Sequence, residues 1–193
     1  SVMNSLASNY GDIPVAAIGI VKKLEMLPHN TGAGICQGMI PLIAYNYASG
    51  NHVRMKKVIR LSRGIVIVFA CFCIVLFTVL ANEISSFFIK ETVTLEMTIR
   101  FLKIMVLATP LTVCNFHMTY SLQAMGKGLS SLILSCSRQG IVLIPLLFII
   151  DQIKGLNGLI WAQLIAEAIT MIAAFILFSF TIKNLKSEKN RNL

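Results

Sequence analysis

A chain of 193 residues with 56% hydrophobic and only 13% charged residues carries about half the charge that soluble domains average. Its mean hydropathy is +0.78, and its charges gather at residues 54–63 and 183–191, so a soluble enzyme with a solvated charged face is excluded. The net charge of +9 belongs to basic residues that flank apolar stretches, which indicates membrane topology and argues against a nucleic-acid partner.

Five apolar stretches follow an opening polar segment, and each is long enough to cross a bilayer as a helix. The sequence therefore predicts an all-α, polytopic transmembrane helix bundle of about five spans. We expect residues 1–12 to be the end of a preceding helix and an external loop, and residues 183–193 to be a basic cytoplasmic tail. The bundle, residues 13–182, is expected to have spans at 13–47, 64–81, 101–125, 129–150 and 156–182.

Proline interrupts three of these spans. Because proline lacks an N–H and its ring disturbs the carbonyl four residues earlier, we expect Pro28, Pro110 and Pro145 to break or kink their helices. The 13–47 stretch is too long for one straight span, and a kink or partial unwinding at Pro28 frees the carbonyl of Leu24.

The lysines and arginines set the expected orientation. Ten of them precede span two, follow span three at Lys127 or lie in the tail, and the opposite ends hold four together with most of the acidic residues. The basic side faces the cytoplasm by the positive-inside rule, so we expect a multi-pass protein of the cell membrane with a cytoplasmic C-terminus. An odd number of spans and no start signal lead us to expect part of a longer protein.

Signatures of catalysis and metal binding are missing from the sequence. It has no HExxH, GxSxG, P-loop or GxGxxG pattern, so we do not expect this protein to be an enzyme. The five cysteines lie within apolar runs without CxxC or Cys/His spacing, so we interpret them as packing residues and expect no metal site.

Lys22, Glu25 and His29 are three and four residues apart, which places them on one helical face beside Pro28. A protonatable group next to a broken helix suits ion coupling, with Glu25 exchanging a proton or sodium ion. The alternative is an ion pair between Glu25 and Lys22 that only neutralises two charges, with Lys22 extending toward the headgroups.

Glu167, Arg138 and His117 are the remaining ionisable candidates at membrane depth. A carboxylate in a membrane span must be protonated, paired or exposed to water, and Arg138 is the expected partner of Glu167. A pair that locks the bundle is as compatible with the pattern as a transport role. His117 is either a packed, hydrogen-bonded histidine or a proton relay.

Three stretches resemble the C-terminal half of the multidrug and toxic compound extrusion (MATE) family. QGMIPLIAYNYASGN is similar to a family segment near the cytoplasmic end of helix eight, although Ile40, Ala44 and Ala48 stand where Gln, Gly and Gly are usual. The turn beginning LQAMGK and the segment GLNGLIWAQLIAE are similar to two further family motifs, with Glu167 at an Asp position. The residues that carry the first two resemblances are Gln37, Gly38, Pro41, Tyr45, Asn46, Tyr47, Gln123, Gly126 and Lys127.

The resemblance implies most of one six-helix lobe, with this chain supplying helices eight to twelve. It implies export of cationic or amphipathic drugs and xenobiotics in antiport with Na⁺ or H⁺, without another cofactor. The partners would be small-molecule substrates, the bilayer and the N-terminal lobe of the same transporter. Two alternatives are a flippase for lipid-linked oligosaccharides in the same superfamily and a non-transporting membrane scaffold.

Overall fold

The computed structural model describes residues 2–191, and side chains as far as Lys183. The described residues form helices joined by short turns, without a strand. The α-helices are α1 (Val2–Ala7), α2 (Asp12–Gly38), α3 (Ile40–Ala48), α4 (His52–Val79), α5 (Ala81–Phe88), α6 (Thr92–Met105), α7 (Thr109–Ala124), α8 (Gly128–Cys136) and α9 (Leu143–Arg191). Two 3₁₀ turns, η1 (Ser8–Tyr10) and η2 (Val106–Ala108), and a π-helical turn, η3 (Ser137–Val142), connect them.

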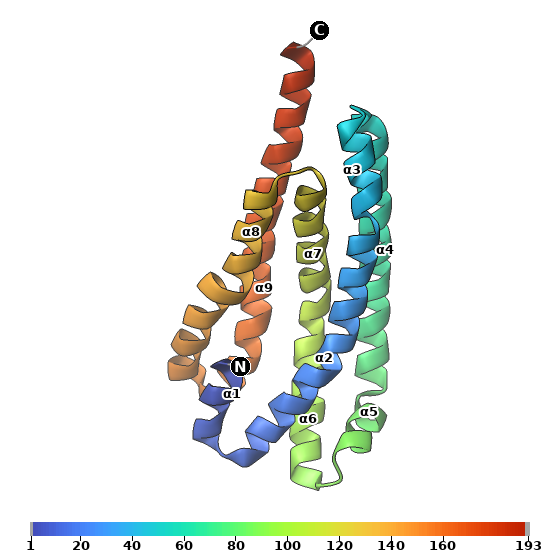
Figure 1. Cartoon of the computed structure of the whole chain (residues 1–193). Helices are drawn as coiled ribbons and strands as arrows, with labels where there is room; N and C mark the ends of the chain where they lie inside the picture. Colours follow the sequence, from blue (N-terminus) through green and yellow to red (C-terminus); the bar gives the residue numbers. More distant parts are fainter. Residues whose placement is uncertain (1, 192–193) are drawn as a thin grey trace.

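The helices pack as one bundle of roughly antiparallel rods (Figure 1). The element called α9 contains a chain reversal at Gly155, whose φ of 57° and ψ of −146° are non-helical. Glycine reaches this left-handed region without a steric penalty, which explains how the chain folds back there. The segment that descends through α8 and η3 therefore ends at Gly155, and the remainder of α9 rises beside it (Figure 1).

Three helical stretches are long and apolar enough to cross a membrane, namely His52–Val79, Thr92–Ala124 and Gly128–Lys183. The last contains the reversal at Gly155 and so supplies two passes. The predicted span 13–47 is not among the three. It is divided at Met39 into α2 and α3, and three of its polar side chains, Lys22, Glu25 and His29, line a pocket between helices.

The sequence predicts either a kink or a partial unwinding at Pro28. The helix α2 continues through this residue without unwinding and bends along its length (Figure 1). The interruption lies at Met39, two residues before Pro41, whose missing N–H leaves the carbonyl of Gln37 without its i+4 donor. The N–H of Met39 bonds to that carbonyl instead.

Pro110 and Pro145 both follow a local change of helix type. Pro110 lies in the first turn of α7, directly after the 3₁₀ turn η2, where its missing N–H costs little. Pro145 lies near the start of α9, after the π-helical turn η3. A π turn spaces the backbone more widely, which makes room for the proline ring against the carbonyl of Ile141.

The opening segment and the basic segment both contain helix. Residues 2–7 form α1, and α4 begins at His52, so the basic segment before Gly64 belongs to the same helix as the second span. Asn51 caps this helix by accepting a hydrogen bond from the N–H of Arg54 at 3.1 Å.

Two groups of buried apolar side chains hold the bundle together. The first joins α1, α2, α6 and α9 around Ile18, Phe101 and Leu159, and the second joins α2, α3, α4 and α7 around Ile43, Met55 and Leu122. Close approach is possible where a small residue faces another helix. A Cβ on Gly32 of α2 would lie 2.9 Å from Cγ2 of Val113 on α7.

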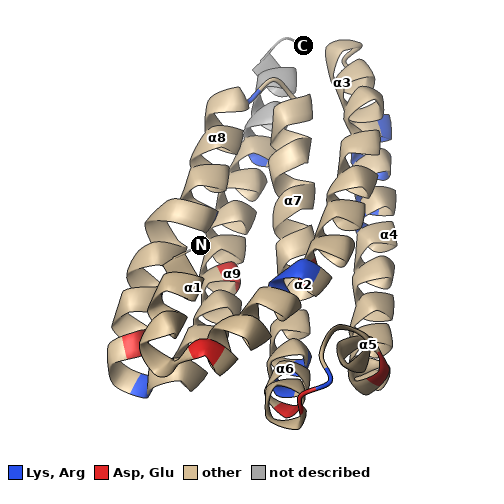
Figure 2. Ribbon diagram, turned by 60° about the horizontal axis from the view of Figure 1, so that its bottom comes forward, with Lys and Arg blue, Asp and Glu red and all other residues tan. Residues whose placement is uncertain are grey.

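Charge is distributed unequally between the two ends (Figure 2). Lys and Arg positions colour the ribbon in the upper part of α4, whereas Asp and Glu positions colour it near α5, α6 and the start of α2. The start of α4, the turn between α7 and α8, and the last turns of α9 all lie at the same end of the bundle (Figure 1). The predicted basic tail includes Lys186, Lys189 and Arg191. The side chains of residues 184–193 are outside the part of the chain that the structure describes.

Candidate functional site

A pocket of about 340 Å³ opens between α1, α2, η3 and α9. Its polar lining comes from residues far apart in the sequence, and these are Lys22, Glu25, His29, Arg138, Gln139, Gln163 and Glu167. Apolar side chains of α1, α2 and α9, such as Met3, Met26 and Leu147, complete the wall. Such a mixture of apolar surface and a few polar groups is typical of sites for small amphipathic molecules.

The Lys22 and Glu25 side chains occupy one face of α2, as the spacing predicts. The Lys22 Nζ lies 3.9 Å from Oε2 of Glu25, and the Glu25 side chain is only 4% exposed. The helix therefore brings an ammonium group to a carboxylate that has little access to water, and each partly neutralises the other.

Gln163 on α9 joins this pair from the opposite side. Its Nε2 donates to Oε2 of Glu25 at 3.3 Å, and its Oε1 accepts a hydrogen bond from Nζ of Lys22. The single amide thus contacts both charged groups with the matching end of its dipole. Sequence reasoning missed Gln163, although it lies four residues before Glu167 and so shares its helical face.

A second carboxylate, Glu167, lies on the same wall of the pocket. Arg138 of η3 forms the expected ion pair with it, with Nη1 at 3.1 Å from Oε1, and the two side chains are 15% and 9% exposed. Asn115 of α7 donates to the other oxygen, Oε2, at 2.8 Å. Both carboxylate oxygens are therefore occupied by donors from different helices.

Asn115 and Thr170 extend this network into the bundle. Asn115 Nδ2 lies 3.2 Å from Oγ1 of Thr170, whereas its own Oδ1 is buried without a hydrogen-bond partner among the described residues. Neither residue was singled out from the sequence. A lone Asn in an apolar span resembles ordinary interhelical packing, and only its place opposite Glu167 distinguishes it.

Five of the six ionisable candidates line this one pocket, and His117 does not. His117 is 1% exposed, and its Nε2 lies 2.9 Å from Oγ of Ser62 on α4. The structure thus places it as a packed side chain that joins α4 to α7. Whether the other five carry ions or substrate stays a prediction.

The side chains that carry the family resemblance lie at the upper end of the bundle, away from the pocket. Gln37 donates to the hydroxyl of Tyr120 at 3.1 Å, and Asn46 donates to the carbonyl of Leu42 at 2.7 Å. Gly126 adopts a φ of 72° in the turn between α7 and α8, and Lys127 precedes the first residue of α8. Of the others, Gly38 and Pro41 flank the α2–α3 junction, Tyr45 and Tyr47 lie in α3, and Gln123 lies in the last turn of α7.

The described helices form one lobe-like bundle with a buried polar pocket, and comparison with solved structures shows where this fold occurs. The Vibrio cholerae MATE transporter VcmN in the bent form matches with a TM-score of 0.86 at 18% identity, over 94% of this chain and 41% of that chain. An outward-facing multidrug resistance MATE family transporter of the MOP superfamily matches with a TM-score of 0.89 at 19% identity, over 96% and 42% of the two chains. At these identities the likeness establishes the fold.

The family follows from the sequence matches. The profile described as MatE matches residues 1–149, and the chain belongs to this family of multi-pass membrane proteins. Multidrug export protein MepA of Staphylococcus saprophyticus is 33% identical over 189 residues, covering 97% of this chain and 41% of the relative. The protein of the same name from Staphylococcus aureus strain MRSA252 is 36% identical over 177 residues, covering 91% and 39%. The chain thus spans about two fifths of the length of these curated relatives.

Proposed function

We propose that the chain forms most of one lobe of a secondary-active exporter that moves drugs and other xenobiotics out of the cell in exchange for Na⁺ or H⁺. The observation that carries this proposal is the pocket in which two nearly buried carboxylates, Glu25 and Glu167, are held by basic and amide groups of other turns and helices. The relatives named as multidrug export proteins support the substrate class.

Glu25 is the residue we propose for coupling. Its carboxylate is shared by Lys22 and Gln163, and neither contact is as short as that of Arg138 with Glu167. A proton or sodium ion that binds Glu25 competes with the Lys22 ammonium group for the same oxygens. Ion binding would therefore release Lys22 and loosen the link between α2 and α9 that Gln163 makes.

Glu167 is better suited to a fixed role. Arg138 and Asn115 occupy both of its oxygens, and breaking such a buried pair costs more free energy than displacing a longer contact. We propose that Glu167 and Arg138 hold α7, η3 and α9 together while Glu25 exchanges its partner. His29, which lines the same pocket, would contact substrate or water there.

The remaining parts of the proposal concern the surroundings of this lobe. A cationic or amphipathic substrate fits the combination of carboxylates and apolar wall. The N-terminal lobe of the same transporter would close the open side of the pocket, and no cofactor besides the coupling cation is proposed. The basic end of the bundle would face the cytoplasm, which places the C-terminus there and the protein in the cell membrane.

The flippase and scaffold alternatives receive less support. A flippase for lipid-linked oligosaccharides would need unpaired basic groups in the pocket, whereas Lys22 and Arg138 are each paired with a carboxylate among the described side chains. A passive scaffold gives no reason for a pocket of this size lined by two carboxylates at membrane depth, since each such group is costly to bury.

The test is efflux of a fluorescent cationic dye by the full-length protein, driven by an imposed Na⁺ or H⁺ gradient in vesicles. Glu25→Gln is expected to reduce gradient-driven efflux at least about tenfold, because the amide keeps the shape but loses the exchangeable charge. Glu96→Gln is the matched control, since Glu96 is exposed on α6 and lies outside the pocket. Unchanged efflux by Glu25→Gln at equal expression would remove Glu25 from coupling.

A further inference from the structure

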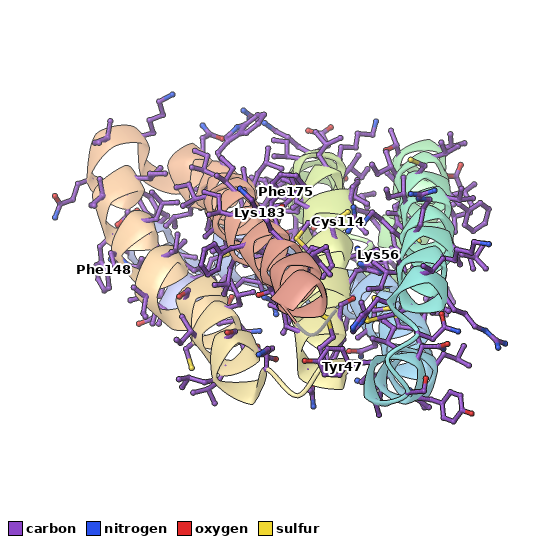
Figure 3. The ribbon with its side chains drawn as sticks, turned by 90° about the horizontal axis from the view of Figure 1, so that it is seen from above. Tyr47, Lys56, Cys114, Phe148, Phe175 and Lys183 are labelled. Atoms are coloured by element: carbon purple, nitrogen blue, oxygen red, sulfur yellow. The ribbon has the colours of Figure 1, made fainter. Side chains whose placement is uncertain are left out.

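A second pocket, which is lined by basic side chains, lies at the upper end of the bundle between α4 and the last turns of α9. It is a pocket of about 190 Å³ lined by Lys56, Arg60 and Arg63 of α4, with Ile59, Phe178 and Ile182 as its apolar wall. In Figure 3, seen from this end, Lys56 lies between α4 and α9. None of these residues belongs to the pocket around Glu25 and Glu167.

The three cations share one helical face by their spacing. Arg60 follows Lys56 by four residues, and Arg63 follows Arg60 by three, so their side chains project in the same direction from α4. Three like charges on one face repel one another, and a helix carries them at a cost unless an anion neutralises them. Their convergence on one pocket therefore indicates an anionic ligand.

No protein carboxylate fills that role among the described side chains. The described ion pairs are Lys22 with Glu25 and Arg138 with Glu167, and neither reaches this pocket. The sequence contains no Asp or Glu between Glu25 and Glu83, which covers all of α3 and α4. Among the side chains that the structure describes, which end at Lys183, α9 has no Asp or Glu after Glu167 either.

The guanidinium group of Arg63 is positioned so that it can bind an anion. Its guanidinium carbon lies 5.6 Å from the centre of the Phe178 ring, and its Nε is buried without a hydrogen-bond partner among the described residues. Stacking on an aromatic ring fixes the plane of a guanidinium and leaves its N–H groups to bind a phosphate through two parallel hydrogen bonds.

The position of the pocket along the helix selects the source of the anion. The basic segment of α4 gives way at Gly64 to an uninterrupted apolar run, so Arg60 and Arg63 stand where the hydrocarbon meets the headgroups. Large apolar side chains around and after this point, such as Leu61, Ile65 and Val68, are exposed on the surface of α4. Basic pockets between helices at this level bind anionic lipid headgroups.

We infer that this pocket binds the phosphate of an anionic phospholipid, with Arg60 and Arg63 on the phosphate, Lys56 nearer the water, and Ile59 and Ile182 against the first carbons of the acyl chains. The volume of about 190 Å³ fits a headgroup and falls below the range of drug-sized pockets. The bound lipid would neutralise the basic side chains of α4 where this helix packs against α9. The inference requires a membrane protein and is independent of the proposed transport activity.

The experiment compares lipid binding by the purified full-length protein and two charge-matched variants. Arg60→Gln/Arg63→Gln removes two positive charges from the pocket, and Arg54→Gln/Lys57→Gln removes two from the same basic segment outside it. Native mass spectrometry with phosphatidylglycerol and phosphatidylcholine measures the affinity for each lipid. The pocket variant is expected to bind phosphatidylglycerol at least about tenfold more weakly, and the control variant within about twofold of the wild type.

Two further measurements identify the source of the bound phosphate and control for misfolding of the variant. Glycerol 3-phosphate at millimolar concentration should not displace phosphatidylglycerol, and if it does, a free phosphate ester is the ligand and the lipid assignment is wrong. Equal losses in both variants, or equal binding of phosphatidylcholine, would also overturn it. If the double variant does not yield folded protein by size-exclusion chromatography, Arg63→Lys keeps the charge but loses the planar fork, and unchanged phosphatidylglycerol affinity would contradict the role of Arg63.

Discussion

The guanidinium of Arg138 pairs with the carboxylate of Glu167 and also lies over an aromatic ring, so that it joins three elements. Its Nη1 lies 3.1 Å from Oε1 of Glu167 on α9, and its Cζ lies 4.5 Å from the centre of the Phe116 ring on α7, while Arg138 itself belongs to the π-helical turn η3. π turns commonly mark functional positions, because the inserted residue redirects a side chain out of the regular helical register. Here the redirected side chain is the partner of a buried carboxylate.

Removing Arg138 should destabilise the bundle by leaving Glu167 with a buried, uncompensated charge. We expect Arg138→Ala to lower the free energy of unfolding by about 3 kcal/mol, measured by denaturant titration in detergent micelles. The double variant Arg138→Gln/Glu167→Gln should recover part of this loss, since both charges are absent. Arg100→Ala on the exposed side of α6 is the control, and a loss equal to that of Arg138→Ala would contradict the structural role of the pair.

Gln163 should set how strongly Lys22 competes for Glu25. Replacing it by leucine keeps the approximate size and removes the acceptor that holds Nζ of Lys22, so the ammonium group is expected to move closer to Glu25. In the full-length protein, Gln163→Leu should raise the cation concentration for half-maximal dye efflux about tenfold. Gln152→Leu, exposed and outside the pocket, should leave it unchanged, and an equal shift in both variants would refute the competition.

A side chain at Gly32 should destabilise the bundle, because Val113 of α7 lies directly against this position. A Cβ on Gly32 would lie 2.9 Å from Cγ2 and 3.1 Å from Cγ1 of Val113, which is fully buried and branched at Cβ. We expect Gly32→Ala to cost about 1 to 2 kcal/mol of unfolding free energy and Gly32→Ala/Val113→Ala to cost less than the sum of the two single changes.

A glycine in the same helix provides the control for that comparison. A Cβ on Gly34 would meet nothing within 4 Å, so Gly34→Ala should be neutral or stabilise α2 by about 0.5 kcal/mol. Strict additivity of Gly32→Ala and Val113→Ala in the double variant would show that α2 and α7 do not approach each other as the structure has them.

Tyr10 should secure the turn at Gly155 from outside the membrane spans. Its hydroxyl donates to Oδ1 of Asp151 at 2.7 Å and lies 3.3 Å from where a Cβ would stand on Gly155. Tyr10→Phe is expected to increase hydrogen exchange of the backbone around Gly155, measured by mass spectrometry at pH 7. Tyr45→Phe, whose hydroxyl has no described hydrogen bond, should leave exchange there unchanged.

The same contact predicts a dependence on pH. The hydrogen bond to Asp151 raises the pKa of Tyr10 above its ordinary value of 10.0. A raised pKa means that the stabilising contact is fully present below the ordinary value and is lost as the pH rises through the raised one. Protection of the Gly155 turn should therefore be constant from pH 6 to about 9 and decrease in strongly alkaline buffer, and an earlier decrease would exclude Tyr10 as the cause.

The sequence alone determined the class of protein, the spacing of the charged groups and the side of the bundle on which the basic segments meet. These follow from local quantities, because the length of an apolar run, the period of a helix and the position of Lys or Arg in the chain do not depend on what packs against them. The shared helical face of Lys22 and Glu25 and the pairing of Arg138 with Glu167 were predicted on this basis and are present.

Only the tertiary structure decided which residues complete the pocket. Gln163, Asn115 and Thr170 are neutral side chains in apolar spans. Gln163 and Asn115 each contact a carboxylate from another helix, and Thr170 contacts Asn115. The same holds for the division of the first span, since whether Pro28 or Pro41 interrupts a helix depends on which freed carbonyl finds another donor. Charge and hydropathy can be counted along a chain, but the partner of a buried polar atom is fixed by packing between segments that the sequence keeps apart.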